Sequence, residues 1–207
     1  SCMDISNPEV PLFFGVIANS TNDVPTALRF FELAAQRGSI QAMNAIGILY
    51  QSAAASISDN PINSFKESLK WFNRALAAGS DDAYKYIGEL YEKNDNKLLA
   101  LHNFIKHYKA TRSIYTARKC AHLFDALGEV NASLKMSRIA ASLGDTNSAL
   151  DIIDILNRNK DVAAVKAWDE LRERYNILRP VDYAFSSFLS AHKGKELTLP
   201  PFAAAAN

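Results

Sequence analysis

Two stretches decide the fold because they spell almost the same pattern: Ala34–Tyr50 reads AAQRGSIQAMNAIGILY, and Ala75–Tyr91 reads ALAAGSDDAYKYIGELY. In each copy a glycine follows a segment whose apolar residues recur with helical spacing. This glycine, Gly38 or Gly79, can adopt the left-handed backbone that ends a helix. A second amphipathic segment follows it, so each copy predicts a helical hairpin.

A further glycine, Gly47 or Gly88, lies inside the second helix of each predicted hairpin. Glycine in a helix interior costs about 1 kcal/mol relative to alanine, so a packing requirement must outweigh that cost. We expect the first helix to cross so closely at these positions that no side chain fits.

Two more copies match this pattern less completely. Arg112–Phe124 (RSIYTARKCAHLF) has Arg112 and Ala121 in the two glycine positions, and Ala140–Leu156 restores the first glycine as Gly144. The longer first interval is explained by a polar insert, QSAAASISDNPINS, which we predict to be a loop. Short helices are expected near Pro8 and after Asp161.

The segment SLKWFNRALAAGSDDAYKYIGELYEK closely resembles the Sel-one-like repeat, a tetratricopeptide-like motif. The resemblance implies an all-α fold, an α-solenoid of stacked antiparallel helical hairpins in a right-handed superhelix. It also implies a role in protein–protein interaction without catalytic residues. We expect an N-terminal lead and capping helix over 1–25, about four repeats over 26–156, and capping helices with an extended tail over 157–207.

Composition excludes some classes of function. The chain has 23 Lys and Arg against 22 Asp and Glu, so it has no overall charge that would indicate binding to nucleic acid. No apolar run is long enough to span a bilayer. Cys2 and Cys120 give no zinc or disulfide spacing. Cys2 is either a cloning residue or the lipid-bearing cysteine of a bacterial lipoprotein, which would serve as an N-terminal anchor.

No catalytic, phosphate-binding or metal-binding motif is present, and we expect no cofactor and no metal. His102 and His107 point to different sides of one predicted helix. Cys120 is interpreted as a small buried apolar residue. Asp151 and Asp154 are interpreted as part of a solvated helix face. A hydrolase that uses these two carboxyl groups ranks third, after the two non-enzymatic functions given below.

A stripe of basic residues is predicted on the outward face of the first helices. Residues 66, 70, 73 and 74 lie opposite the apolar side of the second repeat. The equivalent residues of the other repeats lie at the same distances from their own turn residues. The stretch 96–124 contains no Asp or Glu. The stripe therefore predicts a concave binding wall for a protein with an acidic surface, formed by Arg29, Lys66, Lys70, Asn73, Arg74, Asn103, Lys106, His107, Lys135 and Arg138.

The tail segments RPVDYAF and LTLPPF are similar to the end of a bacterial subset of Sel-one-like proteins. That resemblance implies an immunity protein that neutralises a lipase-type effector of a type VI secretion system. A periplasmic location is then expected, with the cytoplasm as the alternative. The alternative function within the same fold is an adaptor or scaffold of a secretion, signalling or quality-control complex.

Overall fold

The computed structural model describes residues 7–52 and 61–158, and these residues form helices without any strand. The chain divides into two compact units between Thr116 and Ala117. The first unit contains α1 (Glu9–Ser20), α2 (Val24–Gln36), α3 (Ile40–Ser52), α5 (Pro61–Ala77), α6 (Asp82–Lys93) and α7 (Lys97–Thr111). Helix α8 (Ile114–Ala126) crosses the division, and α9 (Val130–Ser142) and α10 (Thr146–Arg158) follow in the second unit.

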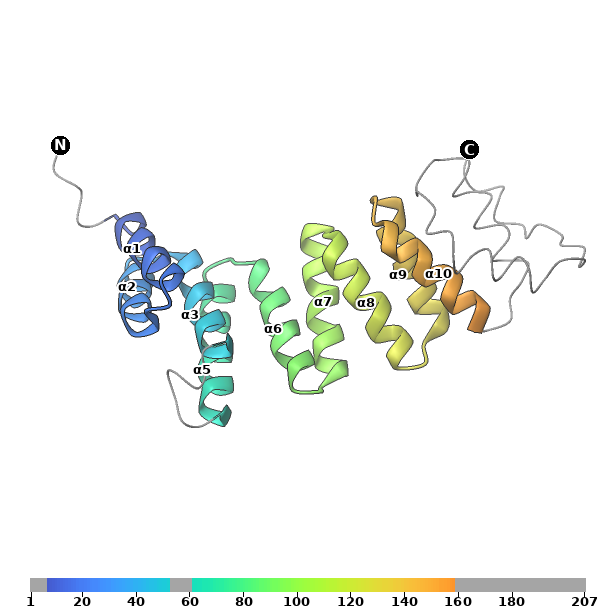
Figure 1. Ribbon diagram of the computed structural model, residues 1–207, viewed down its shortest axis with the longest axis horizontal. Coiled ribbons are helices and arrows are strands. Elements are labelled where there is room, and N and C mark those ends of the chain that lie inside the picture. Colours follow the sequence, from blue (N-terminus) through green and yellow to red (C-terminus); the bar gives the residue numbers. More distant parts are fainter. Residues whose placement is uncertain (1–6, 53–60, 159–207) are drawn as a thin grey trace, which may run out of the picture. The chain divides into compact units, whose positions relative to one another are not determined.

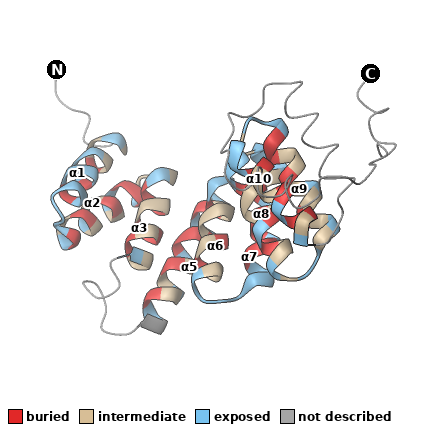
Figure 2. Ribbon diagram, turned by 45° about the vertical axis from the view of Figure 1, so that its right-hand side comes forward, coloured by how far each residue is buried: buried red, intermediate tan, exposed pale blue. Residues whose placement is uncertain are grey.

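Within the first unit, helices that are consecutive in the chain pack against one another, from α1 on α2 through to α6 on α7 (Figure 1). In the second unit α9 packs against α10 in the same way. Buried positions recur along each helix between half-buried and exposed ones, as Figure 2 shows. The predicted all-α solenoid of antiparallel hairpins is confirmed, while the right-handed superhelix stays a prediction.

The turns between paired helices follow the glycine pattern. Gly38, Gly79 and Gly144 have φ angles of 89°, 95° and 100°, which L-residues rarely adopt. Arg112 stands at the equivalent turn with a φ of 55° and ends α7 in the left-handed conformation. The turn glycines of the sequence pattern therefore mark the hairpins correctly.

The polar insert is not a loop over its whole length. Helix α3 extends to Ser52 and α5 begins at Pro61, so both ends of QSAAASISDNPINS are helical. Proline suits the first position of a helix because its fixed φ is already helical and its missing N–H would have no partner there. The expected helix after Asp161 and the tail lie outside the described residues.

At each interior glycine of the first unit, the missing side chain leaves a socket on the helix surface. A phenylalanine ring from a following helix fills this socket. A Cβ atom added to Gly47 would lie 2.4 Å from the ring of Phe72. The equivalent distances are 2.7 Å between Gly88 and Phe104 and 2.5 Å between Gly15 and Phe31. The predicted close approach is confirmed at Gly47 and Gly88, but the ring comes from the first helix of the next hairpin and not from the glycine's own hairpin.

We call these three contacts, Gly15–Phe31, Gly47–Phe72 and Gly88–Phe104, the glycine–phenylalanine pairs. Phe72 and Phe104 are fully buried. Ser68, one helical turn before Phe72, donates a hydrogen bond of 2.8 Å from its Oγ to the carbonyl oxygen of Gly47. The pairs therefore fix both the spacing and the register of neighbouring hairpins.

Candidate functional site

Six of the predicted stripe residues are exposed on first helices of the first unit. They lie on α2, α5 and α7 and comprise Arg29, Lys66, Lys70, Asn73, Arg74 and Lys106. Their side chains do not contribute to the core, which is formed by residues such as Phe31, Phe72 and Ala75. The first unit thus presents a set of basic side chains that are free to meet a partner from solvent.

Several of these basic side chains are held in place by neighbours. The guanidinium carbon of Arg74 lies 4.4 Å from the centroid of the Trp71 ring. Nζ of Lys106 lies 5.3 Å from the centroid of the Tyr84 ring. Both distances are typical of cation–π contacts, which position a cation without neutralising it. Lys70, by contrast, forms an ion pair of 3.1 Å with Glu67, so part of the stripe's positive charge is compensated.

The prediction that Asn103 and His107 face outward is wrong, because both side chains are buried, with 8% and 3% exposure. The error is a register shift of one residue. Phe104 occupies in α7 the place of Phe72 in α5, but α7 has one more residue between this ring and its turn residue. An alignment of the helices on their turns therefore shifts the positions of α7 by one residue. The true equivalents of Lys70 and Arg74 are His102 and Lys106.

His107 is part of a buried hydrogen-bond network. Its Nδ1 lies 3.1 Å from Oγ1 of Thr116, and its Nε2 lies 3.2 Å from Oδ1 of Asp82. Oγ1 of Thr111 also lies 3.3 Å from Nδ1. Both ring nitrogens are thus satisfied, and the imidazole joins α7 to residues on α6 and α8. This histidine stabilises the first unit and is not available to a partner.

Replacing His107 with leucine should lower the free energy of unfolding by about 1 to 3 kcal/mol. The substitution introduces an apolar side chain of similar size, so the hydroxyl of Thr116 loses the imidazole and retains only its hydrogen bond to the carbonyl oxygen of Ser113. Urea denaturation measures the difference. His102→Leu is the matched control on the same helix, and its exposed side chain should cost less than about 0.5 kcal/mol. Equal effects at the two positions would contradict the network.

Lys135 and Arg138 lie on α9, in the second unit. Lys135 is exposed and Arg138 is half-buried. Their continuity with the basic residues of the first unit stays a prediction.

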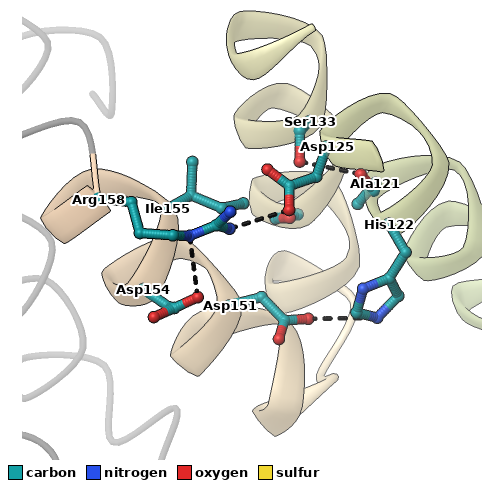
Figure 3. Close-up of a pocket in the computed structure, with 9 residues that line it drawn as sticks. Ala121, His122, Asp125, Ser133, Asp151, Asp154, Ile155 and Arg158 are labelled. Atoms are coloured by element: carbon teal, nitrogen blue, oxygen red, sulfur yellow. Dashed lines mark hydrogen bonds and ion pairs between the residues drawn. The ribbon is translucent and has the colours of Figure 1, made fainter. Parts of the chain in front are cut away.

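The second unit contains a cavity of about 260 Å³ between α8, α9 and α10 (Figure 3). Serine and small apolar residues form part of its wall, and charged residues form the rest. The lining residues are Ala121, His122, Asp125, Ser133, Ser137, Asp151, Asp154, Ile155 and Arg158.

This cavity lies at the position of the missing fourth glycine–phenylalanine pair. Ser133 donates a hydrogen bond of 2.9 Å from its Oγ to the carbonyl oxygen of Ala121, as Ser68 does to Gly47 in the first unit. The residue one turn after this serine is Phe72 in α5 but Ser137 in α9. Ala121 and Ser137 therefore replace a glycine and a phenylalanine, and the volume of the ring is lost.

A second aromatic residue is lost at the same place. In the first unit the Phe72 ring stacks on Tyr86, with 5.4 Å between the ring centroids. Counted from the turn glycines Gly79 and Gly144, the equivalent of Tyr86 is Asp151. A stacked aromatic pair is thus replaced by a hydroxyl and a carboxyl group, which makes the cavity polar.

Ion pairs join several of the residues that line the cavity, as Figure 3 shows. Nη2 of Arg158 lies 2.9 Å from Oδ2 of Asp125, and its Nε lies 3.2 Å from Oδ2 of Asp154. The hydrogen bond with Asp125 is the main cause that raises the pKa of Arg158. Nε2 of His122 lies 3.5 Å from Oδ2 of Asp151. The guanidinium group is therefore fixed between two carboxylates, while Asp151 has a longer contact.

Burial raises the pKa of Asp151 above its usual value of 3.8. The negative charges of Asp145 and Asp154 act in the same direction, whereas His122 and Arg118 oppose it. The prediction of a solvated face describes Asp154, whose side chain is 72% exposed, but not Asp151, whose side chain is 32% exposed. Asp151 is a carboxyl group whose ionisation is disfavoured by its surroundings.

Asp151→Asn should make the protein more stable than the wild type at neutral pH. With a raised pKa, the folded state binds the Asp151 proton more tightly than the unfolded chain does. The wild type therefore loses stability as pH rises from the usual value through the raised pKa, and the loss is complete above it. Melting temperatures from pH 3.5 to 8 should show an advantage of the variant that vanishes toward the acidic end. An advantage of the same size at every pH would contradict the raised pKa of Asp151.

The described residues contain no group of three or more His, Cys, Asp or Glu side chains that could hold a metal ion. Cys120 is fully buried, as the sequence predicts, and burial raises its pKa to about 12, so it is not a nucleophile near neutral pH. Among the helices described, none combines the length and apolar character needed to cross a membrane.

Comparison with known proteins identifies the fold. No family model matches the chain, and no curated protein sequence matches it. Solved structures do match: PilF of Pseudomonas aeruginosa has a TM-score of 0.63 and 15% identity over 91% of this chain and 83% of that one. YrrB, described as a TPR protein with an unusual peptide-binding site, has a TM-score of 0.61 and 15% identity over 91% and 94%.

The MamA protein matches with a TM-score of 0.59 and 13% identity over 92% of this chain and 97% of that one. Identities this low establish similarity of fold and do not transfer a ligand or partner. The chain has an α-solenoid fold similar to that of YrrB, which is described as a TPR protein.

Proposed function

We propose that this protein is a non-enzymatic binding protein whose first unit holds an acidic segment of another protein. The observation that carries the proposal is the set of exposed basic side chains on α2, α5 and α7, namely Arg29, Lys66, Lys70, Arg74 and Lys106. They come from corresponding helices of successive hairpins, so their charges act on the same partner. The resemblance in fold to YrrB, a protein with a peptide-binding site, supports this type of function.

The electrostatic balance of these helices favours an acidic partner. Two of the basic groups, Arg74 and Lys106, lie over aromatic rings that leave their charge uncompensated. Glu67 neutralises one position, Lys70. Complementary charge mainly raises the association rate and selects the partner, and salt weakens it because the groups are exposed.

The double reversal Lys66→Glu and Lys106→Glu tests the proposal. Both side chains are exposed, so the fold should remain intact. A partner captured from lysate with the wild type is purified and titrated at 50 and 300 mM salt. Affinity should fall by about tenfold or more at low salt, mainly through slower association, and the difference should shrink at high salt.

The matched control is Lys97→Glu with Lys109→Glu, which makes the same change in net charge at exposed positions of α7 outside the stripe. It should bind nearly as well as the wild type. Equal losses in both double variants would mean that only net charge matters. Unchanged affinity in the stripe variant would remove the binding role from these residues.

We infer a narrower role from the sequence alone, that of a Sel-one-like immunity protein against a lipase-type effector. Its support is the resemblance of RPVDYAF and LTLPPF, which lie outside the described residues. A periplasmic protein with a lipid anchor at Cys2 fits this role. The competing role is an adaptor, for which a micromolar complex is sufficient, whereas immunity requires a dissociation constant of nanomolar or below. Stoichiometric inhibition of a co-expressed lipase-like partner would favour immunity.

A further inference from the structure

The cavity of the second unit has a polar group that the fold itself does not use. Ser137 is fully buried, and its Oγ has no hydrogen-bond partner among the described residues. Burying a hydroxyl without a partner costs free energy, so such groups are rare in folded proteins. Oδ2 of Asp151 is likewise buried without a hydrogen bond in this part of the chain, with only the 3.5 Å contact to His122. Both unsatisfied groups line the same cavity.

The space is suited to a slender group and not to an aromatic ring. At Gly47 a Cβ atom would lie 2.4 Å from the Phe72 ring, so a Cβ and a ring cannot share this position. Ala121 supplies that Cβ in the second unit. The cavity of about 260 Å³ nonetheless has many times the volume that one water molecule needs. It has the size of an extended side chain.

The charges of the lining favour a cation. Three acidic groups, Asp125, Asp151 and Asp154, line the cavity with one guanidinium group, that of Arg158, which already contacts Asp125 and Asp154. The other basic group of the lining is the imidazole of His122. Asp151 has only the longer contact with His122. A ligand with N–H donors and a positive charge would satisfy Oδ2 of Asp151 and the lone pairs of Ser137 Oγ.

We propose that this cavity is a binding site for a guanidinium or ammonium group on a flexible aliphatic chain. Ser137 and Asp151 accept hydrogen bonds from the cation. Ala121 shapes the base of the site, and the Asp125–Arg158–Asp154 ion pairs hold one wall. The same chemistry is present in a basic side chain of a partner peptide and in a free alkyl-guanidine or amine. This site is separate from the basic residues of the first unit and prefers the opposite charge.

Titration calorimetry on the full chain tests the site with three probes: acetyl-Gly-Arg-Gly-amide, its norleucine counterpart, and agmatine. The arginine peptide or agmatine should bind, and the norleucine peptide should not. Binding only of the peptide would identify a side chain as the ligand, and binding only of agmatine would identify a small metabolite. Amide shifts in ¹⁵N NMR spectra should centre on Ser137, Asp151 and Arg158.

Two variants give the test its specificity. Asp151→Asn should weaken binding by about tenfold or more, because it removes a charge-assisted hydrogen bond. Ala121→Gly with Ser137→Phe should abolish binding by filling the cavity with a ring. Glu129→Gln, which removes one charge from an exposed position of the same unit, should leave affinity unchanged.

The proposal is overturned if neither cationic probe binds at 10 mM, if the norleucine peptide binds equally well, or if Asp151→Asn binds like the wild type. Since Asp151→Asn is expected to fold stably, the last comparison remains decisive even if the cavity-filling variant does not fold. The double variant Lys66→Glu with Lys106→Glu, which tests binding of an acidic partner to the first unit, should bind the cationic probes like the wild type. The proposed binding of an acidic partner and the proposed cation site can therefore be refuted independently.

Discussion

Gly47→Leu is expected to lower the free energy of unfolding by about 3 kcal/mol or more, the largest effect of any single substitution considered for this chain. Overpacking a core usually costs about 1 to 3 kcal/mol, and this site belongs to the upper end. The new Cβ alone would lie 2.4 Å from the Phe72 ring, which is fully buried and stacked on Tyr86. A leucine at this position therefore requires the ring to leave its stacked place or the two helices to separate. Gly88→Leu should act similarly through Phe104.

The proper control relieves the clash from the other side. Phe72→Ala alone should also destabilise, since it empties a buried socket. Combined with Gly47→Leu, it makes room for the leucine, and the double variant should be more stable than the sum of the single effects predicts. Urea denaturation of all four proteins measures the coupling. Strict additivity, or an unchanged melting temperature of Gly47→Leu, would mean that the glycine–phenylalanine pair is not the constraint.

Ala121→Gly combined with Ser137→Phe is expected to raise the free energy of unfolding by about 1 to 3 kcal/mol. The double variant restores the fourth glycine–phenylalanine pair and fills the cavity with a buried ring, whose transfer from water contributes an amount of this order. It also removes the unsatisfied hydroxyl of Ser137. The gain is reduced by the about 1 kcal/mol that glycine costs inside a helix.

The single variants should behave differently from the pair. Ser137→Phe alone brings the ring against the Cβ of Ala121 and should destabilise. Ala121→Gly alone enlarges the cavity and adds the helix cost of glycine. A double variant that is more stable than the wild type, although each single variant is less stable, would show that the two positions form a packing pair that the wild type lacks. Destabilisation by the double variant would mean that Asp151, in place of Tyr86, no longer accommodates a ring.

The hairpins could be predicted from the sequence because their signals are local. Glycine in the left-handed turn, apolar residues at helical spacing and proline at a helix start each depend on a few neighbouring residues. The register of α7 could not be obtained in this way. Its turn carries Arg112 in place of glycine, and one additional residue separates that turn from Phe104. The ring, which packs on Gly88, defines the helix face more reliably than the turn does.

The cavity was not predicted, although the residues that create it are visible in the sequence. Ser137 looks like an ordinary polar residue of a helix until Phe31, Phe72 and Phe104 are known to fill equivalent sockets. The sequence places Asp151 with Asp154 on a solvated face, because spacing within a helix does not reveal which side chains pack on it from the next helix. Alignment of the three phenylalanines would have found the replacement.

The glycine–phenylalanine pairs also determine how unfolding spreads along the chain. In a repeat protein each hairpin is stabilised by its own interactions and by those with its nearest neighbours, so cooperativity depends on the strength of each junction. The junctions α1–α2, α3–α5 and α6–α7 each contain a ring inserted in a socket, whereas α8–α9 has a serine beside an alanine. Among the hairpins that the structure describes, α9–α10 is consequently the one expected to open by itself at the lowest free-energy cost. A ligand in the adjoining cavity would contact both sides of the α8–α9 junction and strengthen it. Opening of the α9–α10 hairpin would then require release of the ligand.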